Sequence, residues 1–351
     1  MLVIFLTFAV FAACQNSRKK NTVKEMTNTG LLGAGATFPM LFYDQLISEY
    51  ITKTGTPITY TGVGSEEGIR RLKNKEVDFG ATDAYLNDVQ AAEFEAPIIH
   101  VPTCLGAVVL AYNLPGITSL KLNNEDLAKI FMGEITKWND KQIKAENPGV
   151  KLPNLNISVI YRLDGSGTTF IFSNYMSKIN EKWAGKIGTV RSLKWPVGTG
   201  ARGNLGVAGL IKQTEGAFGY VGSEYAFTQN IPFVKLQNKA GNFIEPSAES
   251  LSAAAKGNIP SDTRVMLTNS SDPDAYPISA FTWIVIYKEQ AYNGRSLQQA
   301  EATLNFLSWL IGPDAQAEAQ KVNYAPLPEK AVTAARENLE SVTFEGKPVL
   351  K

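Results

Sequence analysis

Three stretches of this chain share one pattern, in which a short apolar run ends in small residues and a helix begins directly after them. The clearest is 159–170, where a β-branched run ends at Arg162 and a helix is predicted over 168–179. The same pattern recurs at 31–39 and at 58–65. Strands that alternate with helices in this way predict an α/β fold with a mostly parallel sheet.

A helix that begins with small residues is suited to bind an anion. The first amides of a helix have no partner within it, and the macrodipole adds positive charge there. Small side chains let an anion approach this backbone, and Arg162 supplies a forked cation beside it. Taken alone, the sequence Asp-Gly-Ser-Gly-Thr at 164–168 is equally typical of a plain turn. The anion interpretation therefore depends on the two other helix starts.

Each of the other two helix starts offers a hydroxyl. Thr37 follows the glycines of the first, and Ser65 follows Gly62-Val63-Gly64 and is the expected N-cap of the next helix. If both meet 166–168, neutral donors surround a small anion, and Arg162 adds one charge.

Asp83 ends a further short strand, 77–83, and is unexpected beside an anion site. A carboxylate is useful there only when the ligand carries a proton to donate. Hydrogen phosphate carries such a proton, whereas sulfate at neutral pH does not. A polar site that expects a donor strongly rejects an analogue that lacks it, and charge repulsion strengthens the rejection. We therefore predict preference for phosphate over sulfate.

The composition excludes several classes of protein. A net charge of +1 argues against a nucleic-acid partner, which would require many cationic contacts. Two distant cysteines and one histidine do not supply a zinc site of the usual spacing. Ser166 as a hydrolase nucleophile would need a neighbouring base, and His100 lies in an apolar run that favours a structural role. We expect no enzyme activity, no metal and no cofactor.

The N-terminal residues predict export. Residues 1–14 form an apolar run too short to span a bilayer, with small residues at its end, as in a secretory signal. Cys14 directly after them resembles the lipidated cysteine of bacterial lipoproteins. An ordinary cleaved signal is the alternative, because no Lys or Arg precedes the apolar run. Residues 15–29 are polar and predict a flexible tether.

The length of 351 residues predicts two lobes. Helices are expected at 123–131, 168–179, 205–214, 247–256, 297–310, 313–322 and 329–339. Strands are expected at 98–102, 105–112, 157–162, 216–221 and 280–287, and 138–153 is expected to be irregular. Arg202, in a glycine-rich loop, either lines a cleft or faces solvent, and solvent is favoured.

Four ordered blocks carry a family resemblance: 33–39, 62–65, 77–83 and 162–168, with two more at 195–198 and 216–221. Together they resemble the phosphate-binding protein of the bacterial phosphate-specific ABC importer, a periplasmic binding protein. The likeness covers nearly all of 30–351. It implies a type II fold with two discontinuous lobes, one of 30–105 plus 278–351 and one of 106–277. Two crossing hinge segments, 105–111 and 277–283, would join them, and hinge closure would complete the site.

The resemblance also implies which residues contact phosphate. They are Thr37, Phe38 (largely by its backbone), Ser65, Asp83, Arg162, Ser166, Gly167 and Thr168. Asp164 is expected to brace Arg162. Glu66 and Glu67 stand where small residues are commoner in the family, so they place carboxylates near the mouth of the site.

The function implied is an extracytoplasmic, lipid-anchored receptor that binds inorganic phosphate and delivers it to an ABC permease, acting as a monomer. Two alternatives remain open. One is a receptor for another tetrahedral oxyanion such as sulfate. The other is a phosphate-sensing or adhesive surface protein without a transport role.

Overall fold

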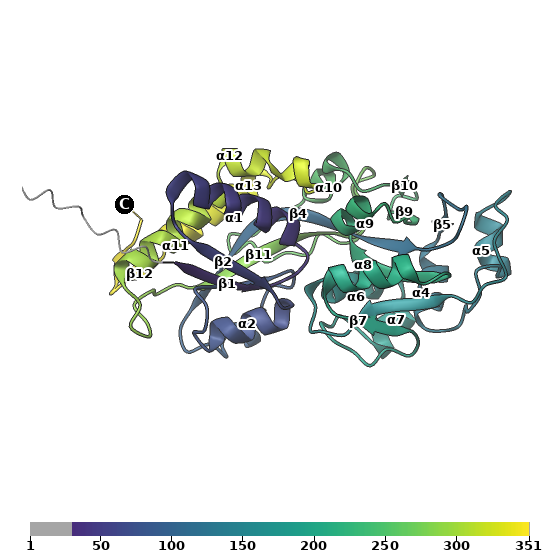
Figure 1. Cartoon of the computed structure of the whole chain (residues 1–351), viewed down its shortest axis with the longest axis horizontal. Helices are drawn as coiled ribbons and strands as arrows, with labels where there is room; N and C mark the ends of the chain where they lie inside the picture. The colour runs from purple at the N-terminus through teal and green to yellow at the C-terminus, as the bar shows by residue number, and fades with distance from the viewer. Residues whose placement is uncertain (1–29, 351) are drawn as a thin grey trace, which may run out of the picture.

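The computed structural model describes residues 30–350. The predicted signal 1–14, the lipidated Cys14 and the tether 15–29 lie outside these residues. One eight-stranded sheet joins the two halves of the molecule (Figure 1). Its strands, in spatial order, are β2 (Ile58–Gly62), β1 (Leu31–Gly35), β3 (Phe79–Thr82), β11 (Ser279–Tyr287), β4 (Ile98–Tyr112), β8 (Ala217–Gly222), β6 (Ser158–Arg162) and β7 (Thr199–Ala201).

The antiparallel strands β4 and β11 make the connection between the halves. β11 pairs with β3 on one side and with β4 on the other, as far as Ser279 opposite Ala107. From Val108 onward β4 pairs instead with β8. The prediction of two separate runs, 98–102 and 105–112, is therefore wrong, because β4 continues through Pro102. The pairing with β11 skips Thr103, directly after this proline, so β4 has a bulge there, a place where a residue without an N–H is tolerated in a sheet.

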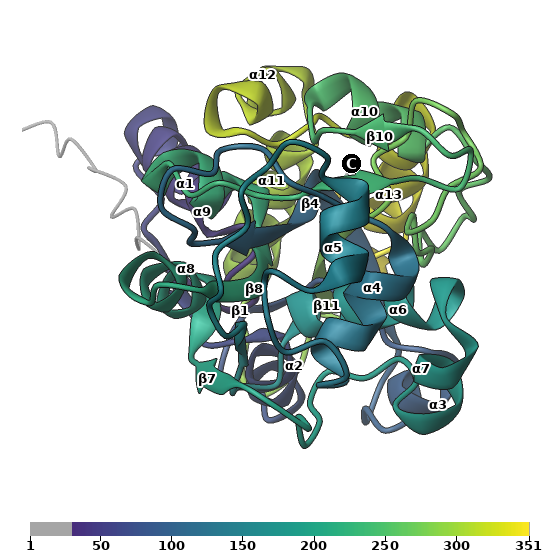
Figure 2. The same ribbon diagram turned by 90° about the vertical axis from the view of Figure 1, so that its right-hand side faces the viewer.

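Helices pack against both halves, and in the end-on view they surround the strands (Figure 2). The first half carries α1 (Met40–Thr54), α2 (Ser65–Lys73), α3 (Asp88–Ala91), α11 (Leu297–Leu310), α12 (Pro313–Ala317) and α13 (Glu329–Glu340). The second carries α4 (Asn124–Phe131), α5 (Lys141–Glu146), α6 (Gly167–Ile179), α7 (Glu181–Lys186), α8 (Gly203–Gln213) and α9 (Ser223–Gln229). α10 (Ala248–Ala254) lies near the junction. Among the helices of residues 30–350, none is both long enough and apolar enough to cross a membrane.

Most predicted elements are present within a few residues of their expected bounds, and α11 spans the predicted 297–310. Two further predictions about these elements are wrong. The stretch 138–153 contains α5, which is too short to show apolar periodicity but is capped by the side chain of Asp140. The helix predicted over 313–322 divides into α12 and a 3₁₀ helix, Ala319–Val322.

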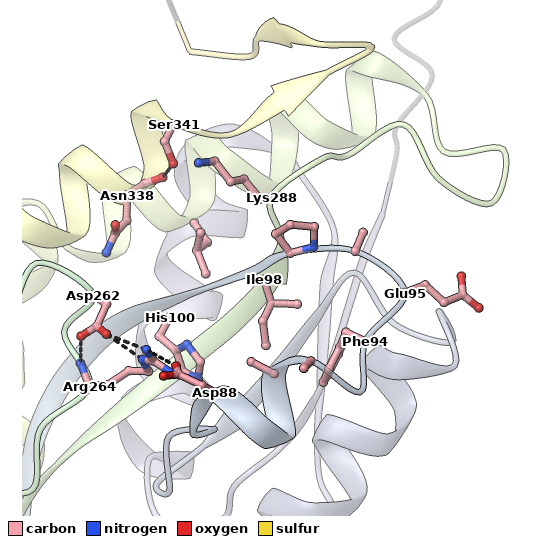
Figure 3. A pocket seen from close by; sticks show the side chains of 15 residues that line it. Asp88, Phe94, Glu95, Ile98, His100, Asp262, Arg264, Lys288, Asn338 and Ser341 are labelled. Atoms are coloured by element: carbon pink, nitrogen blue, oxygen red, sulfur yellow. Dashed lines mark hydrogen bonds and ion pairs between the residues drawn. The ribbon is translucent and has the colours of Figure 1, made fainter.

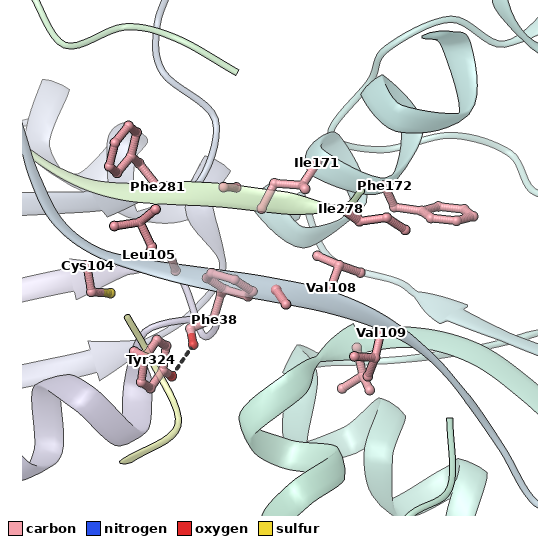
Figure 4. Packing of buried hydrophobic residues seen from close by; sticks show 14 of the residues in the cluster. Phe38, Cys104, Leu105, Val108, Val109, Ile171, Phe172, Ile278, Phe281 and Tyr324 are labelled. Carbon is pink, nitrogen blue, oxygen red and sulfur yellow. Dashed lines mark hydrogen bonds between the residues drawn. The ribbon is translucent and has the colours of Figure 1, made fainter. Parts of the chain in front are cut away.

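A continuous apolar core passes through the junction of the halves. Figure 4 shows Phe38, Leu105, Val108 and Phe281 packed around β4 and β11, and all four are fully buried. A Cβ at Gly106 would overlap the ring of Phe38, so only glycine lets the ring lie against β4. The core thereby fixes the backbone at Phe38, where the predicted site begins.

Candidate functional site

The predicted site residues come together between the two halves, at the carboxyl ends of strands. β1 leads to Thr37 and Phe38, β3 leads to Asp83, and β6 ends at Arg162. Ligands of open α/β sheets bind at this edge of the strands. A hydrogen bond already spans the two halves, because the Gly167 amide donates to Ser65 Oγ over 3.1 Å.

Ser65 lies at the start of α2 but is not its N-cap. Gly64 holds the N-cap position with a φ of 98°, in the left-handed region, and no side chain caps the helix. A Cβ at Gly64 would lie 2.6 Å from an oxygen of Asp164, which also requires glycine there. The buried Ser65 Oγ instead accepts from the amides of Asp83 (3.3 Å) and Gly167 (3.1 Å). Its two acceptor positions are thus occupied from both halves.

Asp83 is buried, with 1% of its surface exposed. Its Oδ1 accepts from Thr282 Oγ1 over 2.7 Å, and its Oδ2 lies 3.5 Å from Ser65 Oγ. Burial raises the pKa of Asp83 to about 7, against the lowering effects of Thr282, Arg162 and Ser65. This carboxyl therefore changes between hydrogen-bond donor and acceptor near neutral pH.

Arg162 and Asp164 form a buried, two-pronged ion pair. Arg162 Nε donates to Asp164 Oδ1 over 2.8 Å, and Nη2 donates to Oδ2. Burial by itself raises the pKa of Asp164, but the hydrogen bond and charge of Arg162 outweigh it and hold that pKa below its usual value. The remaining guanidinium nitrogen, Nη1, donates to Thr168 Oγ1 over 3.3 Å. The pair fixes the orientation of the one cationic group among the predicted contacts.

The start of α6 carries three buried small residues. Ser166 is the N-cap, and its Oγ accepts from the amide of Thr169 over 3.1 Å. A Cβ at Gly167 would overlap Ser65 Oγ and crowd Asp83, so only glycine allows the halves to approach this closely. The positive end of the α6 dipole accordingly faces Ser65 and Asp83.

Several residues at the site were not predicted from the sequence. Asn204 donates from its side chain to Thr37 Oγ1 and Thr168 Oγ1, each over 3.1 Å. The hydroxyls of Tyr225 and Tyr324 donate over 2.6 Å to the carbonyls of Thr37 and Phe38 respectively. The only local signal was for Asn204, which follows a glycine-rich loop at a helix start.

Glu66 and Glu67 leave the centre of the site unobstructed. Glu67 pairs with Arg70 and Arg71 on its own helix, whose hydrogen bonds lower its pKa to about 2. Glu66 contributes its backbone, since its amide donates to the carbonyl of Gly165 over 3.1 Å. These carboxylates therefore belong to the rim.

Two cavities flank the site where the halves meet. One, of 690 Å³, is lined by Glu66, Tyr85, Phe170 and Arg191. The other, of 600 Å³, is lined by Thr37, Asp164, Leu205 and Arg202, and Arg202 at its edge is exposed, in agreement with the favoured solvent position.

A third cavity, of 620 Å³, lies away from these residues (Figure 3). Arg264 pairs there with Asp88 and Asp262, each over 2.8 Å. His100 Nε2 accepts from the amide of Leu86 over 3.1 Å, and burial lowers the pKa of this imidazole to about 3. These contacts give His100 the structural role expected of it. Within the part of the chain that the structure describes, no three His, Cys, Asp or Glu side chains are grouped to hold a metal.

Comparison with known proteins agrees with this geometry. The family model of the PBP superfamily domain matches residues 20–314. The chain is 37% identical over 322 residues to the phosphate-binding protein PstS of Xylella fastidiosa, which covers 90% of this chain and 86% of that protein. The chain belongs to the PstS family. PstS of Haemophilus influenzae is 38% identical over 313 residues, covering 87% of this chain and 91% of the relative.

Members of the PstS family are binding proteins rather than enzymes. A solved high-affinity periplasmic phosphate-binding protein, PfluDING with bound phosphate, shares the fold, with a TM-score of 0.68 at 20% identity. The match covers 88% of this chain and 93% of the other. The predicted family and the two-lobed type II periplasmic binding fold are thus confirmed.

Proposed function

We propose that this protein is an extracytoplasmic receptor that binds inorganic phosphate between its lobes and delivers it to an ABC permease. The observation that carries the proposal is the buried carboxyl of Asp83 among hydroxyl and amide donors. The PstS relatives are named as phosphate-binding proteins, which supports the same ligand.

The proposed contacts divide into donors and one acceptor. The donors are the hydroxyls of Thr37, Ser65, Ser166 and Thr168, the amides of Phe38, Gly167 and Thr168, and the guanidinium of Arg162. For the Ser65 hydroxyl and the Gly167 amide, phosphate oxygens would replace the acceptors seen here, Asp83 Oδ2 and Ser65 Oγ. The acceptor is the carboxylate of Asp83, which receives the proton of hydrogen phosphate. Charge-assisted hydrogen bonds are the stronger kind, so Arg162 is expected to contribute more than any single hydroxyl.

Selectivity against sulfate follows from the acceptor. Sulfate presents an oxygen lone pair where hydrogen phosphate presents a proton, so ionised Asp83 would face it with like charge and no hydrogen bond. The buried position of Asp83 strengthens this repulsion, because electrostatic interactions weaken less in a low-dielectric interior than in water.

We further propose how the chain is divided into lobes around this site and how it is anchored. Lobe one takes 30–105 and 278–351, lobe two takes 106–277, and the crossings at 105–111 and 277–283 form the hinge. The register of β4, which changes partner between Ala107 and Val108, supports this division. The protein acts as a monomer, and Cys14 carries the lipid that anchors it to the membrane through the tether 15–29.

Calorimetric titration tests the ligand directly. The purified protein, freed of bound phosphate, should bind inorganic phosphate one-to-one at pH 7. A folded sample that takes up no phosphate would overturn the proposal. Equal binding of sulfate would retain an oxyanion receptor but remove the proposed role of Asp83.

A further inference from the structure

We propose that Asn204 is a positioning residue that turns the hydroxyl hydrogens of Thr37 and Thr168 toward the bound anion. The inference rests on the proposed phosphate binding and deepens it. Asn204 is the second residue of α8, in lobe two, and its surface is fully buried.

The orientation of the Asn204 amide is fixed by a backbone group. The amide of Gly222 donates to Asn204 Oδ1 over 3.1 Å. A backbone N–H can only donate, so the side-chain oxygen faces Gly222 and the nitrogen Nδ2 faces the opposite way. Nδ2 carries two hydrogens, and it lies 3.1 Å from each of the two threonine hydroxyl oxygens.

Thr168 receives two hydrogen bonds at its hydroxyl oxygen. One comes from Arg162 Nη1 over 3.3 Å and the other from Asn204 Nδ2 over 3.1 Å. Neither nitrogen can accept a hydrogen bond in return. A hydroxyl has two acceptor positions and one hydrogen, so the hydrogen of Thr168 must point away from both donors.

Thr37 is held in the same way from across the cleft. Its Oγ1 accepts from the backbone amide and from Nδ2 of Asn204, each over 3.1 Å. Both nitrogens can only donate, so the hydroxyl hydrogen of Thr37 has no acceptor among these partners, like that of Thr168. Within residues 30–350 neither threonine hydroxyl donates to a protein acceptor. A buried donor without a partner is costly, and an anion oxygen would provide the partner.

The orientation of a hydroxyl matters because it can turn either its hydrogen, which attracts an anion, or a lone pair, which repels it, toward the ligand. With Asn204 absent, each threonine can rotate and turn a lone pair toward the anion, which repels it. Asn204 thus holds both threonine hydroxyls in the orientation in which they donate to the anion. Since Thr37 belongs to lobe one, its orientation is set only when the lobes are closed.

A double-mutant cycle tests this role, with inorganic phosphate as the probe and the dissociation constant as the readout. Asn204→Ala and Thr168→Val should each weaken binding about 10-fold. The double variant should be only about threefold weaker than Thr168→Val alone, because Asn204 then has Thr37 but no longer Thr168 to position. The inference would be overturned if the loss in the double variant equalled the product of the two single losses. It would also be overturned if the affinity of Asn204→Ala were within about twofold of that of the unmodified protein. Gln213→Ala, at an exposed position of the same helix, is the matched control.

The choice of Thr168 separates positioning from lobe closure. Asn204 and Thr168 lie in the same lobe, so a residue that only latched the lobes together would couple to Thr37→Val and not to Thr168→Val. Coupling to Thr37 alone would therefore also overturn the inference.

Asn204→Asp guards against a folding defect. Aspartate retains the oxygen that accepts from Gly222 but has no hydrogen to donate, so the fold-supporting bond remains while the positioning is lost. We expect at least the loss seen for Asn204→Ala, part of it from repulsion between the new carboxylate and the anion, and a lower melting temperature in phosphate-free buffer because the new charge is buried. The cycle remains informative, because this repulsion is present with and without Thr168→Val and cancels from the coupling. If alanine unfolds the protein, the cycle is run with aspartate. Absence of phosphate binding by the unmodified protein would refute the proposed function itself, whereas tight binding with multiplied losses would refute the positioning role alone.

Discussion

The two lobes bring different chemistry to the same site. Lobe two supplies a cation and a helix start, through Arg162 and the residues that begin α6. Lobe one supplies a buried carboxyl, Asp83, beside the hydroxyl of Ser65. We propose that the lobe-two elements favour any small oxyanion, whereas the lobe-one carboxyl tolerates only an anion that carries a proton. The proposal places affinity and selectivity on opposite sides of the cleft.

The largest effect is expected at the lobe-two cation. Arg162→Ala should weaken binding of every oxyanion, with a loss in phosphate binding of more than about 1.5 kcal/mol, because a charge-assisted bond disappears. It should also lower the free energy of unfolding by about 3 kcal/mol, since Asp164 is left buried without its partner. Phosphate titration and urea unfolding measure the two losses.

Arg162→Lys is the matched control. It keeps the charge but not the fork that holds Asp164, so intermediate losses are expected. A loss below about 1 kcal/mol in Arg162→Ala would place the affinity elsewhere than in lobe two.

The contact between the lobes comes next. A Cβ in Gly167→Ala would overlap Ser65 Oγ and hold the lobes apart. Phosphate affinity should fall about 10-fold or more, because the lobe-one contacts are then incomplete, while the melting temperature without phosphate changes little. Small-angle scattering should show that added phosphate no longer compacts the variant. Gly185→Ala, where a Cβ meets no atom within 4 Å, is the control and should bind as the unmodified protein does. Unchanged affinity in Gly167→Ala would show that this contact is dispensable.

Removal of the lobe-one charge should alter selectivity more than affinity. In Asp83→Asn an amide that can donate replaces the repelling carboxylate, so sulfate binding should become measurable, with a gain of about 10-fold or more. Phosphate affinity should fall by a smaller factor. Competition titration measures both, and Asp44→Asn, in α1 of the same lobe, serves as the comparison. An unchanged preference for phosphate over sulfate in Asp83→Asn would show that Asp83 does not determine this selectivity.

The last prediction concerns the pH dependence of stability. The folded-state pKa of Asp83 is raised to about 7, above its unfolded value of 3.8, so the folded protein holds a proton that the unfolded chain releases. This residue therefore makes stability fall as pH rises from about 4 to about 7, by at most about 1.4 kcal/mol per pH unit. Urea unfolding in phosphate-free buffer should show this slope in the unmodified protein but not in Asp83→Asn. Equal slopes in the two proteins would show that burial does not raise this pKa.

The sequence predicted the parts of the site that are local. A helix start rich in glycine and hydroxyl side chains can be recognised within a single stretch of sequence, so 37–38, 65 and 166–168 could be proposed as contacts from the sequence alone. Thr282 and Asn204 could not, because Thr282 reaches Asp83 only through the placement of β11 beside β3, and Asn204 reaches Thr37 only across the closed cleft.

The errors have physical causes of the same kind. Ser65 was expected to cap its helix, but its hydroxyl accepts instead from the amides of Asp83 and Gly167, which sequence spacing does not reveal. The gap expected between residues 102 and 105 did not occur, because β4 continues through it with a bulge at Thr103.

The most direct test of the division between the lobes is the ratio of sulfate to phosphate dissociation constants for the unmodified protein at pH 8. At that pH Asp83 is mostly ionised and hydrogen phosphate still carries its proton. We expect sulfate to bind more than about 1,000-fold more weakly than phosphate, as for other sites built to pair with a ligand proton. A ratio below about 10 would contradict the account, because both anions would then be held by lobe two without selection by Asp83.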